Sequence, residues 1–206
     1  MLRTLKYLRS SCGEFMKAHQ TLRRTLQSLL WLPLGITFVE YFYTLKSIRG
    51  RSMQPTLNPD SSSWRDVVLF DRFAIRILRK YERGDIVALQ SPTDSKLVVK
   101  RIVALQGDMV KTLPPYPDVE IRVPQGHAWV EGDEAFHSED SNTFGPVPLA
   151  LIESKLSFVV WPLARYGPIR KPSSPNPNDP RDPAWRIKKA AVEREQWRNS
   201  RITIAQ

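Results

Sequence analysis

Arg51-Ser-Met-Gln-Pro-Thr-Leu57 lies between a long apolar segment and a region of short β-like runs. Its serine, Ser52, is the candidate nucleophile. A serine hydroxyl is a weak nucleophile at neutral pH, so a base must accept its proton. The candidate base is Lys100, which stands inside the apolar run Leu97–Val103. This pair predicts a Ser–Lys dyad and a fold that brings the two side chains together.

Lys100 can serve as a base only if its amine is neutral. An ordinary lysine has a pKa of about 10.4, whereas a base that works near neutrality needs a pKa of roughly 7–8. Burial lowers the pKa because it disfavours the ammonium form. Strand alternation places three apolar residues on the face of Lys100 and turns Arg101 away from it. The three are Val98, Ile102 and Ala104.

The alternation alone leaves another interpretation of Lys100 open. A strand lysine can extend its amine to water while its stem packs against apolar neighbours. From the pattern by itself, this solvated lysine is the simpler interpretation. The serine motif that accompanies Lys100 favours the catalytic base.

Three motifs occur in order along the chain: Ser52-Met-Gln-Pro-Thr-Leu57, Lys100-Arg-Ile-Val103, and Gly132-Asp133 followed by Ser138-Glu-Asp-Ser141. Together, at this spacing, they resemble the type I signal peptidases, which are membrane-tethered serine proteases with a Ser–Lys dyad. The resemblance runs from about residue 28 to about residue 168. It implies that Ser52 is the nucleophile and Lys100 the general base.

The resemblance also implies roles for residues around the dyad. Ser138 would hold the lysine amine by a hydrogen bond, because a buried amine needs a partner that orients it without charging it. Asp133 would brace Arg101 on the opposite face of the strand. Met53 would pack into the core next to the site. Asp140 would support the same loop.

Two positions depart from the common pattern of the family. Some members carry a hydroxyl where this chain has Gly50, so the oxyanion hole would depend more on backbone N–H groups. Many members carry an arginine where this chain has Asn142. Asp140 cannot form the local ion pair with such an arginine, and it is expected to accept hydrogen bonds from backbone amides.

The run Asp140–Val147 resembles the mitochondrial members of the family. These form a heterodimer of two catalytic subunits, anchored in the inner membrane and facing the intermembrane space. The resemblance therefore implies three kinds of partner: precursor proteins with sorting signals, the other catalytic subunit, and membrane lipid. It implies no cofactor.

The N-terminal part of the chain predicts targeting and anchoring. Residues 1–25 are basic and acid-poor, which is typical of a mitochondrial import signal, although a solvated basic tail remains the alternative. Residues 26–45 are mostly apolar. About twenty helical residues span a hydrocarbon core of about 30 Å, so we predict one transmembrane helix, with a buried or interfacial helix as the alternative. The positive-inside rule assigns the N-terminus to the matrix side.

Residues 46–168 are predicted to form the protease domain. Short runs of β-forming residues, separated by Gly-Asp turns, predict a mainly β fold with a coiled antiparallel sheet. The predicted strands are 67–70, 85–89, 97–105, 109–111, 120–123, 127–130 and 157–161, with a short helical turn within 147–156.

Residues 169–206 are predicted to be a tail that the resemblance does not reach. Residues 172–183 form a proline-rich linker, and residues 185–198 predict an exposed charged helix.

Composition narrows the functional classes. The net charge of +10 suits an anionic membrane surface or nucleic acid, but the basic residues gather at the two ends and no nucleic-acid motif occurs. A single cysteine, Cys12, excludes an internal disulfide. The histidines lack metal-ligand spacing, so no metal is expected. His137 stands near Ser138 and Asp140, which suggests a Ser-His-Asp triad that nothing else supports.

The predicted function is a membrane-anchored serine endopeptidase that removes signal sequences. A non-catalytic assembly subunit with the same fold is one alternative, which intact Ser52, Lys100 and Ser138 disfavour. A self-cleaving repressor-type Ser–Lys protease is another. The predicted membrane segment and the absence of a DNA-binding motif disfavour it.

Overall fold

The computed structural model describes residues 24, 25, 27, 29–38, 41–59, 64–134, 138–169 and 185–205, with the backbone alone for 185–188. The chain divides into two compact units, Met1–Phe42 and Tyr43–Gln206. The described residues of the first unit are helical. Where the structure describes the chain, none of its helices is both long and apolar enough to cross a membrane. Nearly all of the predicted targeting segment lies outside the described residues.

The predicted helix at 26–45 extends too far at its C-terminal end, so this boundary was wrong. Helix is still found at residues 41–42, but Tyr43 begins strand β1 (Tyr43–Ser47). The backbone of β1 pairs with β2 from Tyr43↔Asp71 to Ser47↔Val67. These ladder hydrogen bonds with a neighbouring strand outweigh the apolar character that favoured a continued helix.

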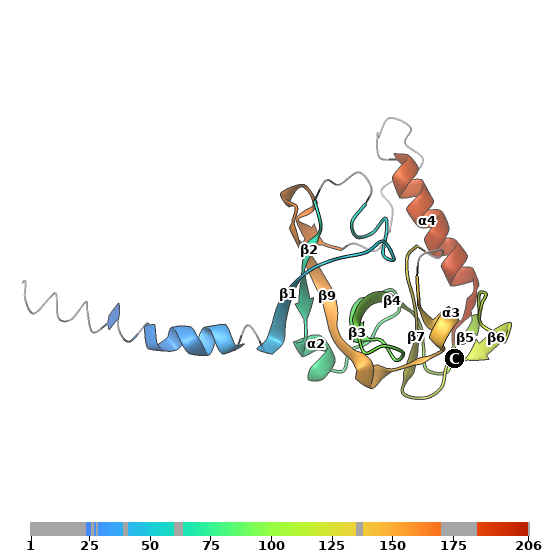
Figure 1. Cartoon of the computed structure of the whole chain (residues 1–206), viewed down its shortest axis with the longest axis horizontal. Helices are drawn as coiled ribbons and strands as arrows, with labels where there is room; N and C mark the ends of the chain where they lie inside the picture. The colour runs from blue at the N-terminus through green and yellow to red at the C-terminus, as the bar shows by residue number, and fades with distance from the viewer. Residues whose placement is uncertain are drawn as a thin grey trace, which may run out of the picture. The chain divides into compact units, whose positions relative to one another are not determined.

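The second unit is built on an antiparallel sheet, as the sequence predicted (Figure 1). In the part of the chain that the structure describes, the strand order of the larger sheet is β1-β2-β9-β3-β4-β7-β8, with β10 beside β9, and a smaller sheet has the order β11-β5-β6. The strands are β2 (Val67–Asp71), β3 (Ile86–Gln90), β4 (Leu97–Leu105), β5 (Met109–Lys111), β6 (Glu120–Arg122), β7 (His127–Glu131), β8 (Val147–Pro148), β9 (Ile152–Trp161), β10 (Gly167–Pro168) and β11 (Ile202–Thr203). Short helices are α2 (Phe73–Arg76), α3 (Ser141–Phe144), η2 (Leu149–Leu151) and η3 (Leu163–Arg165).

Strand β4 has the predicted bounds but does not alternate over its whole length. Its register with β7 shifts between Ile102 and Ala104. Val98 and Ile102 pack with one hydrophobic cluster, whereas Val103 and Ala104 both belong to another. The bulge therefore removes Ala104 from the face on which the sequence had placed it, because an extra residue reverses the alternation that follows.

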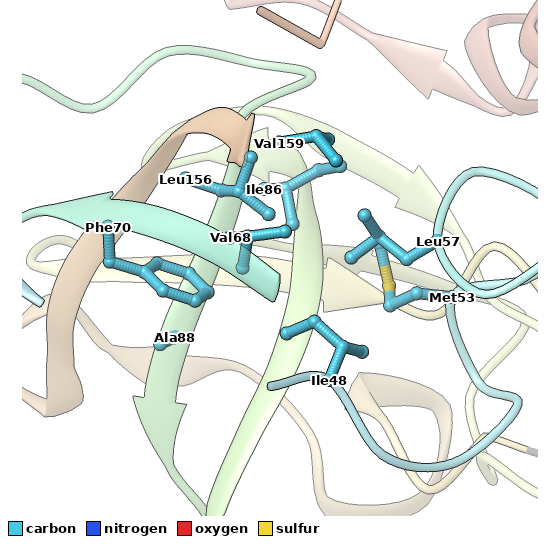
Figure 2. Close-up of a cluster of buried hydrophobic side chains, with 9 residues drawn as sticks. All are labelled: Ile48, Met53, Leu57, Val68, Phe70, Ile86, Ala88, Leu156 and Val159. Atoms are coloured by element: carbon cyan, nitrogen blue, oxygen red, sulfur yellow. The ribbon is translucent and has the colours of Figure 1, made fainter. Parts of the chain in front are cut away.

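The loop that carries Ser52 is held by the core beneath it. Met53 and Leu57 are buried and face Val68, Ile86 and other strand residues in one cluster (Figure 2). Leu57 N–H also donates to the Met53 carbonyl at 2.8 Å. The predicted packing of Met53 is therefore observed, and it fixes the backbone on the C-terminal side of Ser52.

Hydrogen bonds between polar side chains and the backbone fix the C-terminal end of this loop, at Asn58. Asn58 and Asp66 exchange two hydrogen bonds, each 2.8 Å long, between a backbone N–H of one and the side chain of the other. The Asn58 amide also donates to the Ile48 carbonyl at 2.9 Å. Arg165, from η3, pairs with Asp66 and donates to the Thr56 carbonyl. The loop thus has fixed ends.

The C-terminal helix is longer than predicted and is not a separate, exposed tail. Helix α4 (Trp185–Ser200) is followed by β11, which pairs with β5 through Ile202↔Val110 and Thr203↔Met109. Arg201, between α4 and β11, is buried. Figure 1 shows α4 in red ending beside β5 and β6. The predicted domain boundary at residue 168 therefore does not separate this helix from the rest of the second unit.

Candidate active site

Lys100 lies in the middle of β4 with almost no access to water. Its exposed fraction is 3%, and Val87 of β3 is directly opposite it in the sheet. The amine Nζ donates a hydrogen bond to Ser138 Oγ at 2.8 Å. Burial lowers the pKa of Lys100, and this effect outweighs the carboxylates of Asp140 and Glu139, which raise it. The environment therefore shifts the amine towards the neutral form, which is the form that a general base requires.

Gly132, directly after β7, packs between Ser52 and Ser138. A Cβ atom at Gly132 would lie 2.3 Å from Ser138 Oγ and 2.6 Å from the Ser52 carbonyl oxygen, closer than side chains can approach. Glu134 N–H also donates to the Ser52 carbonyl at 3.0 Å. The Ser52 backbone is thus a neighbour of the hydroxyl that contacts Lys100. Two segments far apart in the sequence meet at this glycine, and Ser138 connects them to Lys100 of β4.

Asp140 holds the loop that carries Ser138. Its side chain accepts hydrogen bonds from Gly132 N–H and Asn142 N–H, both at 3.0 Å. Backbone amides are the kind of partner that the sequence predicted for Asp140, although it did not indicate which ones. The Asn142 amide also reaches the Asp140 carboxylate at 3.0 Å and Glu131 at 3.2 Å. Asn142 therefore supplies Asp140 and Glu131 with an uncharged hydrogen-bond donor.

Arg101 and Asp133 form a buried ion pair on the other side of Lys100. Arg101 donates through Nε and one terminal nitrogen to the Asp133 carboxylate at 2.8 and 2.6 Å. A further terminal nitrogen of Arg101 donates to the Gly84 carbonyl at 2.8 Å. Arg198 of α4 also contacts Asp133, at 2.8 Å. This two-point geometry fixes the strand that carries Lys100 against the loop after β7.

The pKa of Asp133 reflects two opposed effects. Burial alone raises it, but the hydrogen bonds and charge of Arg101, together with the charge of Arg198, lower it below the ordinary value of 3.8. A depressed carboxylate pKa stabilises the folded protein at neutral pH. This contribution disappears as the pH falls from about 4 towards the lower pKa of the folded state.

We expect Asp133→Asn to lower the free energy of unfolding by about 3–5 kcal/mol, because it leaves Arg101 buried without its counter-charge. The measurement is urea unfolding of the full chain in detergent micelles, followed by tryptophan fluorescence at pH 7. Asp118→Asn, at an exposed position, is the control and should change stability by less than about 0.5 kcal/mol. Equal stability of the two variants would contradict the structural role of Asp133.

A cleft of about 1130 Å³ opens beside this cluster of residues. The Ser52 loop contributes Arg51 and Pro55 to its walls, and the loop after β7 contributes Gly132. Ser138 lines the same cleft, and so does helix α4. The space is large enough for a peptide segment of several residues, since ligand sites usually measure about 300–1,000 Å³.

The structure brings most of the predicted site residues together, whereas one residue of the alternative triad is not described. Lys100 and Ser138 are in contact, Arg101 and Asp133 are paired, and the Ser52 backbone adjoins Ser138 through Gly132. His137 of the alternative triad lies outside the described residues. Within the ranges that the structure describes, no group of acidic, histidine or cysteine side chains is arranged to hold a metal ion.

Sequence reasoning missed the packing of Gly132 and the residues that hold the site from outside the motifs. Gly132 was identified as part of the third motif and of a turn, but not as a point of close backbone approach, which a glycine also suggests. Glu131, Arg198 and Arg201 were not predicted at all. Arg201 contacts the Glu131 carboxylate at 2.5 Å, and both are buried. No local pattern links residues so far apart in the chain.

The chain was compared with known proteins. The model of the family described as signal peptidase, peptidase S26, matches residues 21–114 and 111–161. Mitochondrial inner membrane protease subunit 2 from Danio rerio is 42% identical over 145 residues, covering 70% of this chain and 78% of that protein. The subunit 2 protein from Saccharomyces cerevisiae is 40% identical over 148 residues, covering 71% and 84%. Subunit 1 from Schizosaccharomyces pombe is 40% identical over 124 residues, covering 60% and 76%.

Proposed function

Because this chain belongs to the signal peptidase S26 family, we propose that it is a membrane-anchored serine endopeptidase with a Ser52–Lys100 dyad. Its substrates would be precursor proteins imported to the mitochondrial intermembrane space, from which it removes the sorting peptides. The family is one of peptidases, and relatives about 40% identical are named as protease subunits of the mitochondrial inner membrane. This supports peptidase activity at that membrane.

The observation that carries the serine mechanism is the environment of the Lys100 amine. The amine is buried on an apolar strand face, its pKa is lowered, and its hydrogen-bond partner is a neutral hydroxyl, Ser138. In the alternative interpretation, a strand lysine whose amine extends to water, the amine would be exposed and not buried. The close packing of Gly132 against Ser52 and Ser138 supports the placement of the nucleophile beside this amine.

The proposed chemistry proceeds in two steps. Ser52 Oγ attacks the peptide carbonyl carbon while Lys100 Nζ accepts the hydroxyl proton, and this proton then passes to the departing amine. The C–N bond breaks and an ester to Ser52 remains. A water molecule then attacks the ester with Lys100 again as base, releasing the acid and restoring the Ser52 hydroxyl. The hydrogen bond from Lys100 to Ser138 keeps the amine oriented throughout.

The proposed assembly is a heterodimer with the other catalytic subunit of the inner membrane protease. Similarity to proteins named subunit 2 and to one named subunit 1 supports a complex of more than one subunit. The proposed anchor is the apolar stretch at 26–45, shortened at its end by β1, with a single span and the catalytic unit facing the intermembrane space. The basic segment at 1–25 supports mitochondrial import.

The experiment that tests the serine mechanism is the capture of the ester at Ser52. The full chain, expressed with a subunit 1 relative whose own nucleophilic serine is replaced by alanine, is mixed with a precursor bearing a sorting signal and quenched in acid during the first turnovers. Trypsin then cuts after Arg51 and Arg65. We expect the 52–65 peptide to carry the mass of the acyl part of the substrate, placed on Ser52 by fragmentation.

Two variants make the capture decisive. Ser52→Ala should form no adduct, whereas Ser47→Ala, an exposed serine on β1, should form as much as the unmodified chain. Cleavage of the precursor without any adduct on Ser52 would contradict the covalent mechanism. Absence of both cleavage and adduct would favour the non-catalytic assembly subunit instead.

A further inference from the structure

Helix α4 forms one wall of the cleft beside the proposed catalytic residues, although the match to the family model ends at residue 161. Arg194, Trp197 and Arg198 line this cleft together with Ser138 and Gly132. The chain therefore adds a surface to the substrate region from outside the part that identifies its family. The cleft and all of its walls belong to the second unit of the chain.

Buried ion pairs fix α4 at the end of β7. Arg198 pairs with Asp133 at 2.8 Å, and its side chain is 13% exposed. Arg201 pairs with Glu131, donates to the Lys111 carbonyl at 3.1 Å and precedes β11. Glu131 and Asp133 flank Gly132, the glycine packed against Ser52 and Ser138. The helix is thus held to the same loop that organises the proposed catalytic site.

With its inner arginines paired, α4 presents Arg194 and Trp197 to solvent and to the cleft. Arg194 is exposed and forms no ion pair within the part of the chain that the structure describes. The Trp197 ring is 51% exposed and lies 4.4 Å from the Arg201 guanidinium. Residues three apart lie on the same face of a helix. The two side chains therefore form one surface, cationic at Arg194 and aromatic at Trp197.

The charges around the cleft favour an acidic ligand on this surface. Three of its acids are compensated: Glu131 by Arg201, Asp133 by two arginines, and Asp140 by backbone amides. Glu134, which is half-buried, is the remaining acid of the walls. Arg194 lines the cleft from α4 and is exposed. The charge that α4 adds to the wall without an ion pair among the described residues is thus cationic.

We propose that α4 is a substrate-recognition element, in which Arg194 binds an acidic side chain of the polypeptide substrate and Trp197 packs against the neighbouring residue. This inference rests on the proposed peptidase function and specifies its substrate class. Guanidinium groups bind carboxylates through paired hydrogen bonds, and exposed aromatic rings supply contact area at low entropic cost. Arg194 and Trp197 determine specificity and take no part in the reaction itself.

The test measures which peptides are cleaved. The full chain with its subunit 1 relative, in detergent micelles, is given a mixture of synthetic peptides of randomised sequence, and the products are identified by mass spectrometry. We expect enrichment of Asp or Glu at one position relative to the cut. Arg194→Glu should reduce this enrichment about tenfold, because a side chain that attracts the acidic residue of the peptide is replaced by one that repels it, at a site partly exposed to solvent. Cleavage of peptides without acidic residues should continue unchanged.

Lys189→Glu is the matched control, since it makes the same charge change on an exposed residue of α4 that does not line the cleft. It should leave the enrichment as it is. An unchanged preference in Arg194→Glu, or no preference for acids in the unmodified chain, would overturn the assignment while the peptidase function stands. Faster cleavage of all peptides by Arg194→Glu would also overturn it, because α4 would then obstruct the cleft. Failure of the unmodified chain to cleave any peptide would remove both proposals.

Discussion

Lys100→Met reduces precursor processing by about three orders of magnitude, if the amine is the general base. Methionine matches the length of the lysine stem but cannot accept a proton, and a positioned general base contributes about 10²–10⁴-fold to a rate. The apolar surroundings that lower the pKa of Lys100 also accept the thioether, so folding should be preserved. The measurement is kcat/KM for a precursor, with thermal unfolding recorded in parallel.

Lys100→Arg tests whether a long, hydrogen-bonding side chain that cannot lose its proton can replace the lysine. A guanidinium stays protonated at every accessible pH, so this variant should be as inactive as Lys100→Met although it retains hydrogen-bond donors to Ser138. Lys96→Met, an exposed lysine just before the same strand, is the control and should process normally. Appreciable processing by Lys100→Met would exclude Lys100 as the base.

The pH dependence of the unmodified chain follows from the direction of the Lys100 shift. Only the neutral amine accepts the Ser52 proton, so kcat/KM should fall as the pH drops through the pKa of Lys100. Because burial lowers that pKa, the midpoint of this limb should lie below 10.5, the ordinary lysine value. A midpoint at or above the ordinary value would show that the amine is solvated during catalysis.

Gly132→Ala is expected to produce the second large loss, of about 100-fold in kcat/KM. Its new methyl group would lie 2.3 Å from Ser138 Oγ, 2.7 Å from Ser138 Cβ and 2.6 Å from the Ser52 carbonyl oxygen. Backbone on one side and a short side chain on the other leave little room to yield. Ser52 and Ser138 must therefore move apart, and a misplacement of about 1 Å can cost about 10²-fold in rate.

The effect of Gly132→Ala on folding should be smaller than its effect on activity. Overpacking of this kind typically costs about 1–3 kcal/mol of stability, which urea unfolding measures. Gly35→Ala is the control, because a Cβ at Gly35 meets nothing within 4 Å and should not affect processing. Normal activity in Gly132→Ala would show that the loop relaxes and that the close packing is not needed for catalysis.

The sequence identified the parts of the fold whose signals are local. Strand β4 has the predicted bounds, and β2, β3 and β7 lie within about a residue of theirs, because each is a run of apolar, β-branched or aromatic residues next to a turn. The boundary at β1 was wrong because its apolar residues suit a helix as well as a strand. Only pairing with β2 distinguishes the two.

The candidate site divides in the same way. The motifs named Ser52, Lys100, Ser138, Arg101 and Asp133, because chemistry restricts the residue types at those positions. The packing of Gly132 against Ser52 and Ser138, and the contact of Ser138 with Lys100, arise only when these segments are folded together.

The sequence by itself determined the family, the run of strands and the residue types that a Ser–Lys peptidase requires, since these depend on composition and spacing along the chain. The tertiary structure alone decided how deeply Lys100 is buried and how closely Gly132 approaches Ser52. It also decided that α4 is held beside the cleft by the ion pairs of Arg198 and Arg201. Burial and ion pairing between distant segments depend on distances in space, and no local pattern records them.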